Sequence, residues 1–352
     1  GAPSQDDPPP LITGPDGRLH REGDPETTYR TPDGRLHFDG DDPGTFRNEL
    51  TQQLQDEKTG RFVKDKFRER PYDFEAVVAD GPHDHTPSDE ARRKLDELAA
   101  QRAKVQAEKD SLRAQIDALP GIAGFPKKED GGNLYGIERI HDLGQKKLRD
   151  TLESAARAVR NNTALDPRHR AALIDDLDRL SDLARQHTAK NKELVSLSER
   201  LGMVAAIDFA TNAAGGVRLT PLVDDEPGVP GTLDVTAALT GDPPRLTVVE
   251  AKGVGSGLGG RLVEGGKKAE QGTPEYLAWV LERDPDLKAA LRERPDLREA
   301  LQKALDNGTL QVEYYTVHSD EAGNVKWSRF DLTRDDASFV PRRIAGLRPV
   351  VG

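Results

Sequence analysis

The chain has 352 residues, of which 35% are hydrophobic, 5% aromatic and 32% charged, and its formal net charge is −11. The length suits two or three domains. The low apolar content argues against a single globule with a thick core, because part of the chain cannot bury enough surface to offset its ordering entropy. No apolar run approaches the roughly 18 residues of a membrane span, and no signal peptide is visible. The absence of cysteine excludes disulfides and thiolate sites, and the negative charge argues against a generic nucleic-acid coat protein.

Residues 1–87 carry a tandem repeat. The string PDGRLH occurs at 15–20 and again at 32–37, and TYR at 28–30 is followed by TFR at 45–47, both at an offset of 17. Asp-Gly turns followed by short alternating segments predict brief strands or extended stubs. We expect an extended, repeat-bearing arm that serves as a linker or for docking, with a distinct binding module as the alternative.

Residues 88–189 have the pattern of an elongated helical hairpin or bundle. The sequence TPSD at 86–89 predicts a helix start, and apolar residues then recur at helical or heptad spacing amid dense charge. We expect this helix to end near residue 120, a second helix to cover 137–160, and a third to begin near residue 166. The charged faces are interpreted as solvated surface without chemistry.

The periodicity changes again from about residue 190. The predicted elements are a helix at 193–213, strands at 217–222, 232–239 and 246–251, a helix at 271–281, two short helices that open at 285 and 295, and strands at 311–318 and 326–332. Residues 190–352 are therefore predicted to form an α+β domain with the element order α-β-β-β-α-β-β.

The third of these strands ends in residues that could carry chemistry. Glu250 and Lys252 alternate along the strand and therefore share one of its faces. The turn sequence at 241–244 predicts a hairpin that brings Asp234 of the preceding strand near Glu250. Two converging carboxylates repel each other unless a cation lies between them, and Mg²⁺ or Mn²⁺ fits such oxygen ligands. Lys252 would then position or deprotonate a water, as in metal-assisted phosphodiester hydrolysis; the alternative is an ordinary edge-strand ion pair.

This arrangement resembles the PD-(D/E)xK nuclease superfamily, whose restriction-endonuclease-like core has the order α-β-β-β-α-β. Asp234 matches the family's Asp, Glu250 and Lys252 match its E-x-K, and Gln271, in QGTPEY at 271–276, matches a Gln found in many members. The resemblance implies a Mg²⁺-dependent endonuclease in which Asp234 and Glu250 bind the metal. It implies that Lys252 acts on the attacking water and that Gln271 supports the lysine or the scissile phosphate.

The resemblance also implies a third metal-binding acid on the first helix. Glu199, in SERLG at 198–202, is our preferred candidate because its surroundings resemble the family's helix pattern. Asp208 is the alternative, and either acid could instead cap the helix or pair with an arginine.

A glycine-rich segment at 253–266 follows the E-x-K sequence. Glycines allow a backbone to approach a phosphate closely, and Arg261, Lys267 and Lys268 could contact a nucleic-acid backbone. The alternative is flexibility without function.

The string QGTPEY at 271–276, together with VVEAKG at 248–253 and GLGGR at 257–261, is similar to nuclease-type toxin domains at the C-termini of actinobacterial polymorphic toxins. The N-terminal repeats are similar to the linkers that precede such domains. This resemblance implies a secreted effector that acts in the cytoplasm of a target cell, with DNA as the expected polymer and RNA as the alternative. It further implies a cognate immunity protein. Two other hypotheses remain open: an inactive nuclease-like binding module, and a secretion or structural adaptor built on the helical arm.

Overall fold

The computed structural model describes residues 7–119, 145–224, 228–229 and 231–350. The chain divides into two compact units, a first unit of Gly1–Leu95 with Glu199–Gly352 and a second unit of Asp96–Ser198. The fold is mixed α+β, as the sequence predicts, but the units differ from the domains expected at 1–87, 88–189 and 190–352. Within the described ranges, no helix combines the length and apolar character needed to cross a bilayer.

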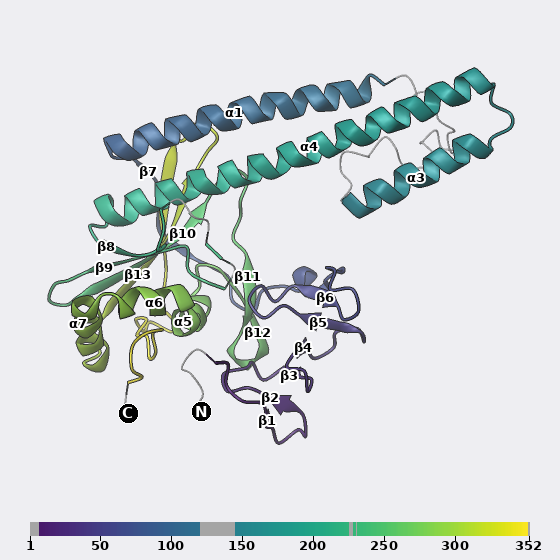
Figure 1. Cartoon of the computed structure of the whole chain (residues 1–352). Helices are drawn as coiled ribbons and strands as arrows, with labels where there is room; N and C mark the ends of the chain where they lie inside the picture. Colours follow the sequence, from purple (N-terminus) through teal and green to yellow (C-terminus); the bar gives the residue numbers. More distant parts are fainter. Residues whose placement is uncertain (1–6, 120–144, 225–227, 230, 351–352) are drawn as a thin grey trace. The chain divides into compact units, whose positions relative to one another are not determined.

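The first unit is built on a mixed sheet (Figure 1). Its strands are β7 (Val78–His85), β8 (Val217–Thr220), β9 (Val235–Leu239), β10 (Arg245–Lys252), β13 (Gln311–Ser319) and β14 (Val325–Phe330). They lie in the order β7-β14-β13-β10-β9-β8. β8, β9 and β10 form an antiparallel meander, β13 is parallel to β10, and β14 and β7 continue the sheet antiparallel. The predicted order of strands is therefore present.

β7 is the main departure from the predicted organisation. It belongs by sequence to the segment expected to be an arm, yet it pairs with β14, with His83 opposite Trp327 and His85 opposite Val325. The sheet of the C-terminal region is thus completed by a strand from the N-terminal region. The predicted boundary at residue 87 cuts through this sheet and is wrong.

Three helices that lie between β10 and β13 in the sequence cover one face of the sheet. They are α5 (Pro274–Arg283), α6 (Pro285–Arg292) and α7 (Pro295–Asp306). Leu246 and Val248 of β10 and Tyr314 of β13 pack into one buried core with apolar residues of these helices. Because neighbouring residues of a strand point to opposite faces, Tyr315 lies on the other face, where its ring contacts Phe209 at 5.0 Å between centroids.

Among the described residues, one helix is longer than the sequence predicts. They are α1 (Asp89–Asp117), α3 (Gln145–Asn161) and α4 (Pro167–Asp208), the last followed by a short π-helical turn at Phe209–Ala213. The helices predicted from 166 and over 193–213 are one continuous helix, because no Pro or Gly interrupts residues 168–201. α1 ends at Asp117, close to the end predicted near residue 120. Residues 137–144 of the predicted second helix lie outside the described residues.

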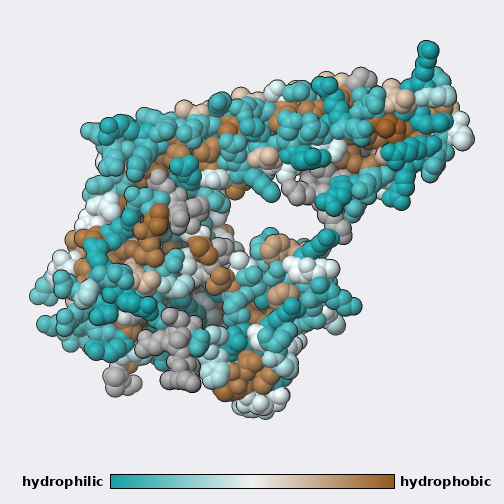
Figure 2. All heavy atoms as spheres, viewed as in Figure 1, coloured by the Kyte–Doolittle hydropathy of each residue, from teal (hydrophilic) through white to brown (hydrophobic). Residues whose placement is uncertain are grey.

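Apolar side chains of these three helices meet in the second unit. Leu112 and Ile116 of α1, Leu152 and Val159 of α3, and Leu177 of α4 belong to one buried cluster. In Figure 2, hydrophilic residues cover most of the helical part, and hydrophobic atoms gather along the line where helices meet. This is the pattern of an amphipathic bundle, as the sequence predicts.

The N-terminal repeats form a small sheet instead of an extended arm. Its strands are β1 (Ile12–Thr13), β2 (Leu19–His20), β3 (Thr28–Arg30), β4 (Leu36–Phe38), β5 (Thr45–Arg47) and β6 (Leu54–Asp56), paired in sequence order. Together with the 3₁₀ turn at Lys66–Glu69, we call residues 12–69 the repeat module.

Buried arginines hold the repeat module together. Arg30 donates to Asp24 and Glu49, and Arg47, one repeat later, donates to Asp41 and Asp65. Each arginine therefore joins an acid six residues earlier to one in the following repeat. Such paired charges satisfy each other's hydrogen-bonding groups in a module with too few apolar residues for a thick core.

Candidate active site

The hairpin of β9 and β10 sets the first two carboxylates side by side. Val235 lies opposite Val249 in this antiparallel pair, so the next position places Asp234 opposite Glu250. Asp234 Oδ2 accepts a hydrogen bond of 2.8 Å from the Ala251 amide. Glu250 is 1% exposed, and Asp234 beside it is partly buried.

Burial and mutual repulsion favour the protonated forms of this pair. Burial, followed by the charge of Asp234, raises the pKa of Glu250 from 4.5 to about 8, and Lys252 acts in the opposite direction. Burial likewise raises the pKa of Asp234. A cation placed between the two carboxyl groups would favour their ionised forms and lower both pKa values.

Gln271 connects the carboxylate pair to the lysine. Lys252 Nζ donates to Gln271 Oε1 at 2.7 Å, and the Gly259 amide donates to the same oxygen at 2.8 Å. Gln271 Nε2 lies 3.4 Å from Glu250 Oε2, to which it donates. The glutamine thus fixes Lys252 and Glu250 relative to each other, in agreement with the supporting position that the sequence suggested.

Glu199 reaches the same place through a close approach of α4 to β10. A Cβ atom on Gly202 would lie 2.8 Å from the Lys252 carbonyl carbon and from the Gly253 nitrogen, so only glycine allows the helix this close. Glu199 lies three residues earlier on the same helix face. Its side chain is exposed and lines the same cleft as Asp234 and Lys252.

Asp208, the alternative helix acid, does not line this cleft and has a structural role. Its side chain is buried and is hydrogen-bonded to His85 Nε2 at 2.8 Å, to Ser88 Oγ at 2.7 Å and to Asn212 Nδ2 at 2.6 Å. Burial acts to raise the pKa of Asp208, but these hydrogen bonds outweigh it and hold the pKa below its usual value. Asp208 therefore anchors β7 and the start of α1 to the end of α4.

We expect Asp208→Ala to lower the free energy of unfolding by about 3 kcal/mol, because it leaves buried polar partners without an acceptor. Glu199→Ala, on the exposed side of the same helix, should change it by no more than about 0.5 kcal/mol. Because the pKa of Asp208 is lowered by folding, its contribution should be complete above the ordinary value of 3.8 and shrink at lower pH. Denaturant unfolding at pH 7 and pH 3 measures both effects, and equal losses for the two variants would contradict the assignment.

The cleft has a volume of about 460 Å³ and is lined by Glu199, Asp234, Lys252, Arg261 and Gln271. Glycines of the segment at 253–260 line it too, but the rest of the predicted glycine-rich loop contains a strand, β11 (Gly260–Val263), paired with β12 (Lys267–Glu270). The buried Arg261 Nε has no hydrogen-bond partner among the described residues. A guanidinium with an unused hydrogen-bond donor can bind an anionic ligand.

The two predicted nucleic-acid contacts on β12 are not in the cleft. Lys268 is buried, and its ammonium donates to the carbonyl oxygens of Phe67, Arg68 and Arg70. It therefore holds the repeat module, and the expectation that it contacts nucleic acid is wrong. Lys267 is exposed but does not line the cleft.

Sequence reasoning missed three supporting residues. Tyr314 Oη donates to Glu250 Oε1 at 2.5 Å, and Tyr276 Oη accepts from Gln271 Nε2 at 3.4 Å. The buried Asp284 caps α6 and accepts from the Leu233 amide at 2.9 Å, next to Asp234. For Tyr314 the sequence offered a signal, because a tyrosine in a buried strand requires a hydrogen-bond partner for its hydroxyl group.

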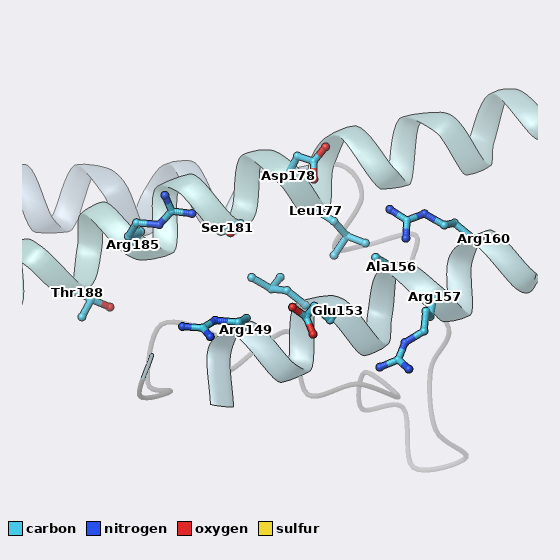
Figure 3. Close-up of a pocket in the computed structure, with 11 residues that line it drawn as sticks. Arg149, Glu153, Ala156, Arg157, Arg160, Leu177, Asp178, Ser181, Arg185 and Thr188 are labelled. Atoms are coloured by element: carbon cyan, nitrogen blue, oxygen red, sulfur yellow. The ribbon is translucent and has the colours of Figure 1, made fainter. Parts of the chain in front are cut away.

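A larger hollow of about 770 Å³ lies between α3 and α4 in the second unit (Figure 3). Arg149, Arg160 and Arg185 line it together with acidic Glu153 and Asp178. These side chains are exposed, and their mixed charges fit the solvated surface expected from the sequence. We assign no chemistry to this hollow.

Among the described residues, no three His, Asp or Glu side chains converge closely enough to form a metal-ligand group as placed. Asp234 and Glu250 supply two adjacent carboxyl groups at the cleft, one fewer than such a group requires. Comparison of the chain with family models, with curated proteins and with solved structures gave no match.

Proposed function

We propose that the protein is a metal-dependent nuclease that hydrolyses phosphodiester bonds, with DNA as the favoured polymer. The observation that carries this proposal is the adjacent pair of Asp234, which is partly buried, and Glu250, which is buried. Gln271 joins Glu250 to Lys252 at the end of β10. The element order and the parallel pairing of β10 with β13 support a restriction-endonuclease-like fold for this part of the chain.

The chemistry of the donor set fits a hard divalent cation. Asp234, Glu250 and Glu199 offer only oxygen ligands. Burial raises the pKa of Asp234 and of Glu250, and the charge of Asp234 raises that of Glu250 further, so a cation here would offset both effects. Mg²⁺ or Mn²⁺ bound here would stabilise the negative charge that develops on the scissile phosphate.

Other residues of the chain would activate the water molecule, bind the substrate and orient the metal ligands. Lys252 lies where it can orient a water molecule and take part in its deprotonation, and Gln271 holds the ammonium in place. Arg261 lines the cleft and would contact a phosphate of the substrate through its guanidinium. Tyr314 would keep the Glu250 carboxylate oriented by donating to it.

The resemblance to polymorphic toxins leads us to propose, further, that this nuclease is the toxic part of a secreted effector that acts in a target-cell cytoplasm and meets a cognate immunity protein. The competing function is an inactive nuclease-like binding module.

A cleavage assay separates the two functions. Supercoiled plasmid and a structured RNA are incubated with the full chain in Mg²⁺, in Mn²⁺ and in EDTA. The nuclease proposal expects cleavage with either metal and none in EDTA. Intact DNA and RNA under all conditions, with retained binding to either, would establish the binding module instead.

A further inference from the structure

The side chain of Gln52, in the repeat module, pairs with the backbone of β11 at the wall of the cleft much as a neighbouring strand would. The Leu262 amide of β11 donates to Gln52 Oε1 at 2.9 Å, and Gln52 Nε2 donates to the Leu262 carbonyl at 3.4 Å. Gln52 is buried, as is Leu262, which packs against Leu36 and Phe38 of the module. Leu262 is the neighbour of Arg261, so this contact bears directly on the strand that carries the cleft's arginine.

Gln52 is itself held firmly. Its amide donates to the Asn48 carbonyl at 2.9 Å, and its own carbonyl accepts from the buried guanidinium of Arg47 at 3.1 Å. Arg47 in turn is paired with Asp41 and Asp65. Gln52 thus connects the ion-paired Arg47 of the repeat module to β11 at the cleft wall.

The same turn reaches the mouth of the cleft. Asn48 Oδ1 accepts from the amides of Leu50 and Thr51, which fixes the turn, and these two residues line the cleft with Asp234 and Lys252. Leu50 is 51% exposed. An apolar side chain at this position offers nothing to a phosphate, but it can contact a sugar or a base.

We propose that the turn at 48–53 is one wall of the substrate cleft and that Gln52 is the positioning residue that fixes it to the strand of Arg261. Given the proposed nuclease function, the repeat module acts in substrate binding, with Leu50 against the sugars or bases of a nucleic-acid strand. The cleft is then completed by a segment whose sequence resembles a linker.

The first test concerns the contact and requires no enzyme activity. Hydrogen exchange is measured in the full chain for wild type, Gln52→Ala and the neighbouring Gln53→Ala. Loss of the paired hydrogen bonds should speed exchange of the β11 amides by about tenfold or more in Gln52→Ala, with no change in Gln53→Ala. Unchanged exchange in Gln52→Ala overturns the positioning role.

The second test concerns the substrate. Leu50→Glu and Val63→Glu place the same charge on exposed apolar positions of the module, and only Leu50 lines the cleft. Leu50→Glu should raise KM for an oligonucleotide by about fivefold or more at low salt, leave kcat within about twofold, and lose part of its defect at high salt. Gln52→Ala should shift KM in the same direction.

The outcomes are distinguishable. A fall in kcat at unchanged KM, or equal effects of Leu50→Glu and Val63→Glu, rules out a binding wall. If wild type cleaves nothing, the nuclease function fails, and the same variants are then compared by equilibrium binding of the oligonucleotide. Exchange decides the Gln52 contact independently of either result.

Discussion

Asp234→Asn is expected to abolish cleavage while making the metal-free protein more stable. The asparagine oxygen can still accept from the Ala251 amide, but the buried pair loses one of its two carboxylates. We expect the free energy of unfolding at pH 7 to rise by about 1–3 kcal/mol, and cleavage to fall by at least about a hundredfold because a cation ligand is lost. Denaturant unfolding in EDTA and a plasmid assay in Mg²⁺ measure the two effects.

Lys252→Ala supplies the contrast, because it should abolish cleavage and lower stability. The ammonium lowers the pKa of both carboxyl groups, so its removal leaves the buried pair with less compensation. Lys267→Ala, an exposed lysine outside the cleft, is the matched control and should change neither property. If Asp234→Asn and Lys252→Ala shift stability in the same direction, the electrostatic account of the site is wrong.

The parts of the site that the sequence predicts are those that depend on local geometry. Strand alternation and one turn are enough to bring Asp234 beside Glu250, and the hairpin of β9 and β10 has this arrangement. Gln271 comes from the resemblance to the PD-(D/E)xK superfamily, and it contacts Lys252 and Glu250. These inferences need only neighbouring elements, for which turn sequences and residue periodicity carry most of the information.

What the sequence does not predict depends on pairings between distant segments. β7 joins β14 across more than two hundred residues, and its sequence, VADGPHDH at 78–85, lacks the apolar alternation of a typical strand. Lysine is usually found on the protein surface, and only the fold shows that the repeat module covers Lys268. Long-range burial of this kind leaves little local signal, because charged residues are ordinarily exposed.

Mg²⁺ affinity should increase with pH up to about 8, because the cation competes with the proton that Glu250 keeps below its raised pKa. The pKa of Glu250 is raised by folding from 4.5 to about 8. Between these values the folded protein keeps a proton that the unfolded chain has lost, so metal-free stability falls as pH rises through this range. Binding of the cation releases this proton, and the apparent affinity gains up to about tenfold per pH unit.

Thermal unfolding with EDTA or Mg²⁺ at pH 6, 7 and 8 measures this linkage. The stabilisation by Mg²⁺ should be smallest at pH 6 and largest at pH 8, because mass action follows the apparent affinity. Glu250→Gln removes the titrating group, so the variant should lose the response to Mg²⁺ and the decline of metal-free stability with pH. The wild-type and variant curves are compared as differences, since other groups titrate equally in both. A wild-type response to Mg²⁺ that is independent of pH would place the cation away from this carboxyl pair.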